Sequence, residues 1–157
     1  EAITNRCYDA LMNVIAENRR ATFDYDIVET VDAGLILTGQ EVKSCRLGQA
    51  NLAGAYVSFY SGKPVLKHAK ISAYKFASGI DDYDPDRDRP LLLRKNELAR
   101  LEAAIAEKGM AIVPLKILAG KYIKVTLGLG KGRKRFDKRQ KIKSREMDRR
   151  LKMGKEF

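Results

Sequence analysis

The positive charge of this chain is concentrated at its C-terminal end. Residues 131–157 carry 13 basic and 4 acidic side chains, whereas residues 1–130 carry 18 basic and 16 acidic ones. A segment that repels itself and has little apolar surface cannot offset the entropy that it loses on ordering. We therefore expect a nearly neutral folded body and a basic tail that is disordered, or at most a nascent helix, until it meets a polyanion.

The length of the chain limits it to one folded domain with appendages. Its 157 residues suffice for one hydrophobic core but not for two. Hydrophobic residues make up 45% of the chain, so it is not disordered by composition as a whole. We assign residues 1–17 to an N-terminal leader or short helix, residues 18–130 to the folded body and residues 131–157 to the tail.

The cysteines and the hydrophobic runs indicate a cytoplasmic protein with free thiols. Cys7 and Cys45 make neither a disulfide framework nor a CxxC metal motif, and the first residues lack a signal-peptide pattern. No apolar run approaches the roughly 20 residues that span a bilayer. The tail also has too few large apolar side chains for a good membrane-surface helix. Nucleic acid is therefore a better candidate polyanion than a membrane.

Strand and helix patterns alternate along the body. Apolar and acidic residues alternate from Phe23, which predicts a strand, and residues 32–34 predict a turn into a second short strand. Residues 39–49 predict a short helix that Gly48 ends. The positions of this helix that we expect mainly on exposed faces are Glu41, Lys43 and Arg46.

Two hairpins and a second helix complete the predicted body. Residues 61–62 and 119–120 each separate two alternating apolar patterns, which is typical of a hairpin turn. Between the hairpins, Asn96 can cap a helix that ends at Gly109. The inward stripe of this helix is predicted to be Leu98, Leu101 and Ile105.

These elements predict a mainly β fold. About six short antiparallel strands with two to three short helices favour a closed OB-like barrel, because closure removes the exposed edges of a small sheet. An open α+β sandwich stays possible, since strand order cannot be read from one sequence.

Few residues could support catalysis. The only histidine, His68, has no neighbouring nucleophile motif and no second histidine to work with. The aspartates of 82–88 alternate like the start of a calcium loop, but Arg87 and Leu93 stand where that loop needs glycine and glutamate. The glycines of 128–132 match no nucleotide-binding motif, although their NH groups suit a nucleic-acid backbone. We expect no enzyme, no catalytic residue, no metal site and no cofactor.

Four blocks of the sequence are similar to one known family. They are NRRATFDYDIVETVDAGLILTGQEVKSCRLGQANL at 18–52, RPLLLRKNEL at 89–98, VPLKI at 113–117 and GKGRKRFDKRQKIKSRE at 130–146. In this order they resemble the small protein B (SmpB) family, the transfer-messenger RNA (tmRNA)-binding proteins of bacterial trans-translation.

The resemblance implies a function and a set of partners. Proteins of this family are closed OB-like barrels that bind the tRNA-like domain of tmRNA. With elongation factor Tu, the alanylated complex enters the A site of a stalled ribosome, and the basic tail folds as a helix in the empty mRNA channel. We therefore expect a monomer whose partners are tmRNA, the ribosome and, through the tmRNA complex, elongation factor Tu.

The resemblance also implies which residues contact RNA. Asp32 stands where the family usually has Glu, Arg94 where Asn is common, and Phe23 where His is common, so Arg94 favours a phosphate contact and Phe23 keeps stacking. The expected tmRNA-binding residues are Arg19, Arg20, Asp32, Gly34, Glu41, Lys43, Arg46, Asn51, Leu92, Arg94 and Lys131. The expected ribosome-binding residues of the tail are Lys134, Asp137, Lys138, Arg139, Lys141, Lys143 and Arg145.

The same residues allow other interpretations. Glu41 and Lys43 could form a solvated helix face, and for Leu92 we favour the core over the interface. For three aromatic residues we favour packing over base stacking; they are Tyr56, Tyr60 and Tyr74. A ribosomal protein with a basic extension is the second functional hypothesis, and an RNA-processing nuclease is a distant third.

Overall fold

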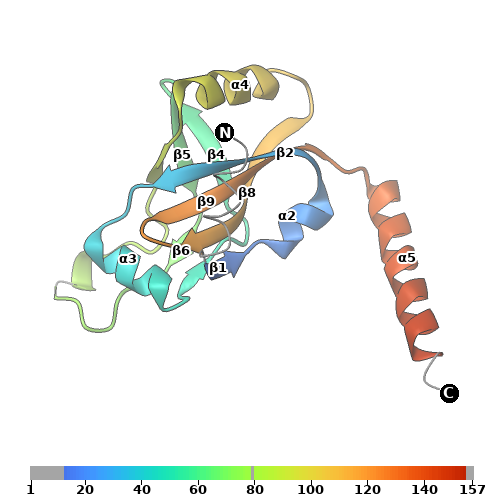
Figure 1. The fold of residues 1–157 in the computed structure, drawn as a ribbon, viewed down its shortest axis with the longest axis horizontal. Helices are drawn as coiled ribbons and strands as arrows, with labels where there is room; N and C mark the ends of the chain where they lie inside the picture. The colour runs from blue at the N-terminus through green and yellow to red at the C-terminus, as the bar shows by residue number, and fades with distance from the viewer. Residues whose placement is uncertain (1–12, 79, 155–157) are drawn as a thin grey trace.

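The computed structural model describes residues 13–78 and 80–154, and Figure 1 shows their arrangement around one curved sheet. The strands are β1 (Asn13–Glu17), β2 (Tyr25–Leu35), β3 (Ala50–Asn51), β4 (Tyr56–Tyr60), β5 (Lys63–Lys67), β6 (Lys70–Ile71), β7 (Arg89–Leu92), β8 (Met110–Ala119) and β9 (Ile123–Gly132). The helices are α2 (Arg19–Asp24), α3 (Gly39–Arg46), α4 (Lys95–Ile105) and α5 (Arg135–Met153), with a 3-10 turn η1 (Ile80–Asp82).

The main sheet is antiparallel, mixes distant parts of the chain and stays open. Its seven strands follow the order β1-β8-β9-β2-β7-β5-β4, and β3 and β6 form a separate pair. The sheet curls so that β4 lies near β8, but within the described residues no pairing joins the edge strands β1 and β4. The predicted mainly β fold is confirmed, whereas the predicted closed barrel is not, and the strands outnumber the predicted six.

Strand β2 continues where the sequence predicts a turn. Asp32, Ala33 and Gly34 pair with β9 opposite Thr126, Val125 and Lys124, and Gly34 also pairs with β7. The predicted turn at 32–34 is wrong because β9 supplies partners to all three residues and β7 pairs with Gly34 as well, and such pairing outweighs the local preference of Asp and Gly for turns.

The chain before α2 belongs to the sheet. Residues 13–17 form β1 and pair with β8, so they are neither a leader nor a short helix; residues 1–12 of that prediction lie outside the described part. Asn18 then caps α2, and its buried side-chain amide donates to the carbonyl oxygens of Leu52 and Pro114 at 3.2 and 3.1 Å. These bonds fix the start of α2 to the body.

Both predicted hairpins are confirmed. In the β4–β5 hairpin, Ser61 and Gly62 take left-handed conformations with φ of 49° and 73°, as a two-residue turn of this type requires. In the β8–β9 hairpin, pairing runs from Ala119 opposite Ile123 to Met110 opposite Lys131. Val125 and Leu127 of β9 are fully buried in the core, as their alternation predicts.

The two predicted helices of the body are also present. Helix α3 spans Gly39–Arg46 and helix α4 spans Lys95–Ile105, with Leu101 buried on its inner side. The predicted cap of α4 at Asn96 is wrong by two positions. The helix begins after Arg94, whose backbone NH donates to the Glu97 carboxylate at 3.1 Å.

Candidate nucleic-acid interface

A buried ion cluster fixes α3 to the body. Glu41 is fully buried, and its carboxylate accepts hydrogen bonds from Arg89 at 3.1 Å and from Arg87 at 2.7 Å. It also accepts from the backbone NH of Thr38 at 2.9 Å and so completes the capping box at the start of α3. The prediction that Glu41 lies on an exposed face is wrong, because two guanidinium groups and a helix cap occupy its carboxylate inside the fold.

The same partners set the ionisation of Glu41. Burial alone would raise its pKa, but hydrogen bonds from Arg87 and Thr38 and the charges of Arg89 and Arg87 hold the pKa below its ordinary value of 4.5. The unfolded chain therefore takes up this proton more readily than the folded one. The stability that Glu41 contributes is complete above pH 4.5 and is lost as the pH falls through the folded pKa.

Replacing Glu41 with glutamine is expected to flatten this acid dependence. The variant should be less stable than the wild type at neutral pH, and its free energy of unfolding should fall less steeply as the pH drops below 4.5. Urea denaturation at a series of pH values measures both effects. The exposed residue Glu107 supplies the control, since Glu107→Gln should keep the wild-type slope. A wild-type slope in Glu41→Gln would contradict the assignment.

Next to α3, strands β2 and β7 form a groove that joins apolar and cationic side chains. A Cβ atom at Gly34 would lie 3.2 Å from Leu92 Cβ, so glycine permits the close approach of the two strands. Leu92 is 60% exposed, and the interpretation of Leu92 as a core residue is therefore wrong. The groove has a volume of about 610 Å³, and its lining includes Ile36, Val42, Arg46, Lys121, Tyr122 and Lys124.

A second groove adjoins the first along the same strands. It has a volume of about 540 Å³, shares Gly34, Leu92 and Lys124 with the first groove, and adds Asp32 and Arg94. The Asp32 carboxylate accepts from Thr126 Oγ1 at 2.7 Å, which fixes its direction on the sheet surface. We call these grooves together the β2–β7 surface, with Asp32, Gly34, Arg46, Leu92, Arg94 and Lys124 as its defining residues.

The β2–β7 surface offers the contacts that structured RNA requires. Arg46, Arg94 and Lys124 can bind phosphates, and the exposed side chains of Leu92 and Tyr122 can pack on bases or sugars. The Asp32 carboxylate can accept from base amino groups or 2′-hydroxyls. The structure therefore brings together five of the predicted RNA-binding residues: Asp32, Gly34, Arg46, Leu92 and Arg94.

The other predicted RNA-binding residues do not line the two grooves. Arg19 and Arg20 project from α2, where Arg20 pairs with Asp24 at 3.4 Å. The Asn51 carboxamide oxygen accepts from the Ala53 backbone NH at 2.8 Å. Lys131 is exposed near the end of β9, and Lys43 lies on α3 with its ammonium 5.5 Å from the centroid of the Tyr74 ring.

Within the basic tail, Arg135–Met153 form one helix, α5, that leaves the body beside α2 (Figure 1). Lys138 pairs with Asp24 at 2.8 Å, Lys141 donates to the carbonyl oxygen of Thr22 at 3.4 Å, and the Arg145 guanidinium lies 5.6 Å from the centroid of the Phe23 ring. The hydrogen bond from Lys138 is the main reason why the pKa of Asp24 is below its ordinary value. No residue of α5 is buried, and disorder of the free tail stays a prediction.

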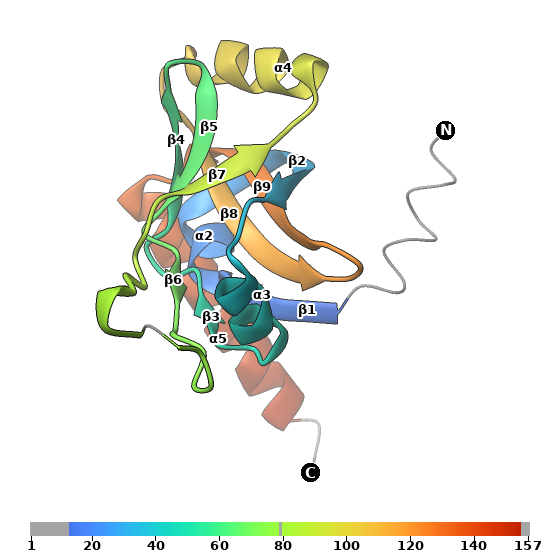
Figure 2. The same cartoon turned by 90° about the vertical axis from the view of Figure 1, so that its left-hand side faces the viewer.

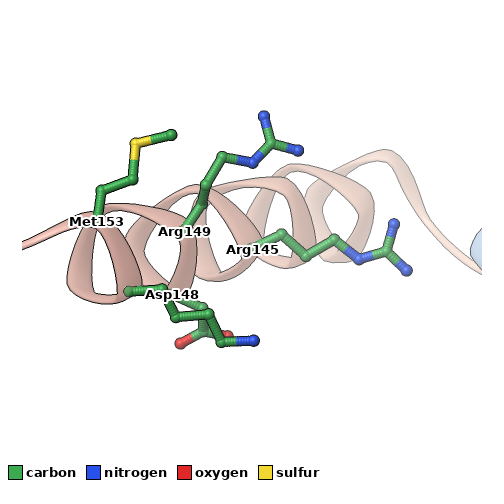
Figure 3. Close-up of a pocket in the computed structure, with 5 residues that line it drawn as sticks. Arg145, Asp148, Arg149 and Met153 are labelled. Atoms are coloured by element: carbon green, nitrogen blue, oxygen red, sulfur yellow. The ribbon is translucent and has the colours of Figure 1, made fainter. Parts of the chain in front are cut away.

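The far half of α5 is an open cationic face. Figure 3 shows Arg145, Arg149 and Met153 along this part of the helix, with Asp148 directed to another side. The hollow between these side chains is lined by residues of this one helix, so it has no second wall to hold a small ligand. The same face can follow a phosphate backbone with its guanidinium groups. The remaining predicted tail residues lie on or just before the helix: Lys134, Asp137, Arg139 and Lys143.

Sequence reasoning missed two functional features. Arg89, the first residue of β7, is fully buried and engages Glu41, although no sequence pattern predicts a role for it. Lys124 and Tyr122 line the β2–β7 surface but carry no motif of their own. The available signals were the arginines interleaved with the aspartates and the position of Tyr122 in a hairpin turn. Among residues 13–78 and 80–154, His, Cys, Asp and Glu form no cluster that could hold a metal ion.

Comparisons with known proteins identify the family of this surface. The family described as SmpB protein matches residues 15–156. The chain belongs to the SmpB family. It is 47% identical to the SsrA-binding protein of Lactobacillus helveticus (strain DPC 4571) over 88% of this chain and 91% of that protein. It is 44% identical to the SsrA-binding protein of Synechococcus sp. (strain JA-2-3B'a(2-13)) over 91% of this chain and 94% of that protein.

A solved structure extends the family match to the fold. The structure described as "tmRNA-SmpB: a journey to the center of the bacterial ribosome" contains a chain that is 45% identical, with a TM-score of 0.63 over 76% of this chain and 84% of that one. The predicted resemblance to SmpB proteins is thus confirmed. SmpB is a family of RNA-binding adaptors and not of enzymes. Within the described residues, the structure contains no helix long and apolar enough to cross a membrane.

Proposed function

We propose that this protein binds tmRNA through the β2–β7 surface and acts as an adaptor in trans-translation. The observation that carries the proposal is the convergence of Asp32, Leu92, Arg94, Arg46 and Lys124 on two adjoining grooves. Such a surface matches the shape and 2′-hydroxyl recognition typical of folded RNA. The relatives named SsrA-binding proteins and the structural match to a tmRNA-SmpB complex support the choice of RNA.

Within this function, Glu41 acts from inside the fold. A buried carboxylate with two guanidinium partners does not reach RNA, so we propose that it positions α3, which carries Lys43 and Arg46 on its exposed side. Asp32 remains the acidic residue that meets RNA directly. Arg19, Arg20, Asn51 and Lys131 would then contact RNA only beyond the two grooves.

We further propose that the protein acts in the cytoplasm and that its body and its tail have separate roles. The body would bind the tRNA-like domain and, with elongation factor Tu, deliver the alanylated RNA to the A site of a stalled ribosome. Helix α5 would enter the empty mRNA channel, where its exposed cations meet ribosomal RNA. The absence of buried residues on α5 supports this division, because such a helix can leave the body without exposing core.

Binding of tmRNA through base and sugar contacts should be less sensitive to salt than binding of RNA through the charges of the tail. Affinity for tmRNA and for a structured control RNA of equal length is measured at two salt concentrations. We expect the tmRNA complex to persist at the salt that dissociates the control, because each phosphate neutralised adds about 0.9 to the log–log salt slope, whereas base and sugar contacts add little. Leu92→Ala should remove the preference for tmRNA. If the higher salt concentration weakens the binding of both RNAs by wild-type protein equally, the ribosomal-protein hypothesis is favoured instead.

A further inference from the structure

We propose that Tyr74 and Phe76 form a stacking platform for an unpaired base of the bound RNA. The inference rests on the proposed function, since it names a further contact of the same RNA. Both rings belong to the loop 72–78 that follows β6, and Figures 1 and 2 place this loop beside α3. The platform would therefore extend the β2–β7 surface across the outer side of that helix.

The exposure of Phe76 is the first observation. Its side chain is 82% exposed, the largest value of any large hydrophobic residue in the described part of the chain. Its ring meets that of Tyr74 edge to face, with 5.6 Å between the centroids. A single exposed apolar residue is common on a protein surface and needs no ligand. Here a second ring supports the first, and the pair leaves aromatic surface uncovered.

The loop that carries the rings is fastened at both ends. The Ser44 hydroxyl of α3 donates to the carbonyl oxygen of Ser72. The Ser72 backbone NH donates to the carbonyl oxygen of Gln49 at 3.0 Å, and the Gln40 amide donates to that of Ser78 at 3.2 Å. A held loop has less conformational entropy to lose on binding. Its rings are therefore presented in advance rather than ordered by a ligand.

The charges around the rings favour a nucleotide over an apolar protein partner. Lys43 places its ammonium 5.5 Å from the Tyr74 ring centroid, and Lys75 is exposed between the two aromatic residues in the sequence. A nucleotide supplies phosphates to these cations next to a base for the rings. An apolar partner would leave both cations desolvated without partners. Lys43 and Arg46 lie one turn apart on α3, so this patch continues into the groove.

The test exploits the lack of tryptophan in the chain. Phe76→Trp introduces a single tryptophan, whose fluorescence reports stacking on a base. We expect tmRNA to quench this emission. We also expect Phe76→Ala to weaken tmRNA binding about tenfold without changing its salt slope, because stacking releases no counterions. Tyr60→Ala is the matched control: Tyr60 is 75% exposed, and Figure 2 places its hairpin turn away from α3.

The outcomes separate this inference from the proposed function. Weaker binding by Phe76→Ala, together with quenching in Phe76→Trp and unchanged binding by Tyr60→Ala, supports the platform. If the wild type prefers tmRNA but Phe76→Ala binds equally well and the tryptophan signal does not change, the platform is wrong and the adaptor function stands. If the wild type shows no preference for tmRNA, both proposals fail. Thermal unfolding of Phe76→Ala should match the wild type, because its ring is exposed.

Discussion

Replacing Arg89 with alanine is expected to lower the free energy of unfolding by about 3–5 kcal/mol, the usual effect of removing one partner from a buried ion pair. Arg89 is fully buried and lies 3.0 Å from the Glu41 carboxylate. Its guanidinium also donates to the carbonyl oxygens of Ala69, Arg87 and Pro85. The alanine variant would leave three carbonyl oxygens, of which that of the buried residue Ala69 is one, without this donor, and Glu41 with Arg87 alone as its cationic partner. The loss therefore combines electrostatics with unmade hydrogen bonds.

Arg87 provides the matched comparison. It also pairs with Glu41, at 2.7 Å, but its side chain is 40% exposed, so water can replace part of what Arg87→Ala removes. We expect a clearly smaller loss for Arg87→Ala than for Arg89→Ala in urea denaturation at neutral pH. Arg89→Lys should also be destabilising, because an ammonium cannot reproduce the planar fork of donors. Equal losses in the two alanine variants would show that burial does not govern the strength of this cluster.

The parts of the fold that local sequence determines were predictable. The β4–β5 hairpin depends on the left-handed conformations of Ser61 and Gly62, and the pattern of alternation on either side identifies the strands. Helix α3 depends on a capping box and on Gly48, whose φ of 76° ends the helix. These signals lie within a few residues of the elements that they specify, so one sequence contains them in full.

Features that depend on distant partners were not predictable. Residues 32–34 look like a turn until β9 pairs with all three of them and β7 pairs with Gly34. Glu41 looks exposed until Arg87 and Arg89 arrive from a segment more than forty positions away. A charged residue in a helix is most often solvated, and only the tertiary structure reveals its partners. It was likewise not predictable that the edge strands β1 and β4 stay unpaired with each other, because the periodicity of a sequence does not reveal the order of its strands.

The candidate site shows the same division. Family resemblance located Asp32, Leu92 and Arg94, and the structure shows that they share one surface. Lys124 was missed because the alternation of β9 explains it as an ordinary outward-facing lysine. Tyr122 was missed because it lies in the β8–β9 turn and belongs to no motif. Tyr60 was expected to pack in the core and is exposed instead, because it ends an edge hairpin where its neighbours along the strand cannot cover it. Burial of an aromatic side chain depends on the neighbouring strand as much as on the residue type.

Deleting residues 133–157 is expected to leave tmRNA affinity nearly unchanged and to abolish tagging of stalled nascent chains. The deletion begins after Gly132, the last residue of β9, so every strand pairing of the sheet is retained. The contacts between tail and body lie on α2 and at the start of β2, such as the Lys138–Asp24 and Arg133–Asp26 pairs, and partly exposed pairs of this kind contribute about 0–1 kcal/mol each. No residue of α5 lines the β2–β7 surface. Body and tail therefore meet different RNAs in the proposed function.

The reciprocal variant makes this division testable. Leu92→Ala with Arg94→Ala removes exposed side chains of the β2–β7 surface and retains the whole tail, so it should lose tmRNA affinity and, with it, tagging. Filter binding measures the first property, and a reconstituted translation reaction on a truncated message measures the second. The truncated protein should bind tmRNA yet give no tagged product even when it is present in excess, because excess restores a weak complex but not a missing tail. Loss of free tmRNA binding on truncation would instead place the RNA contacts on the tail.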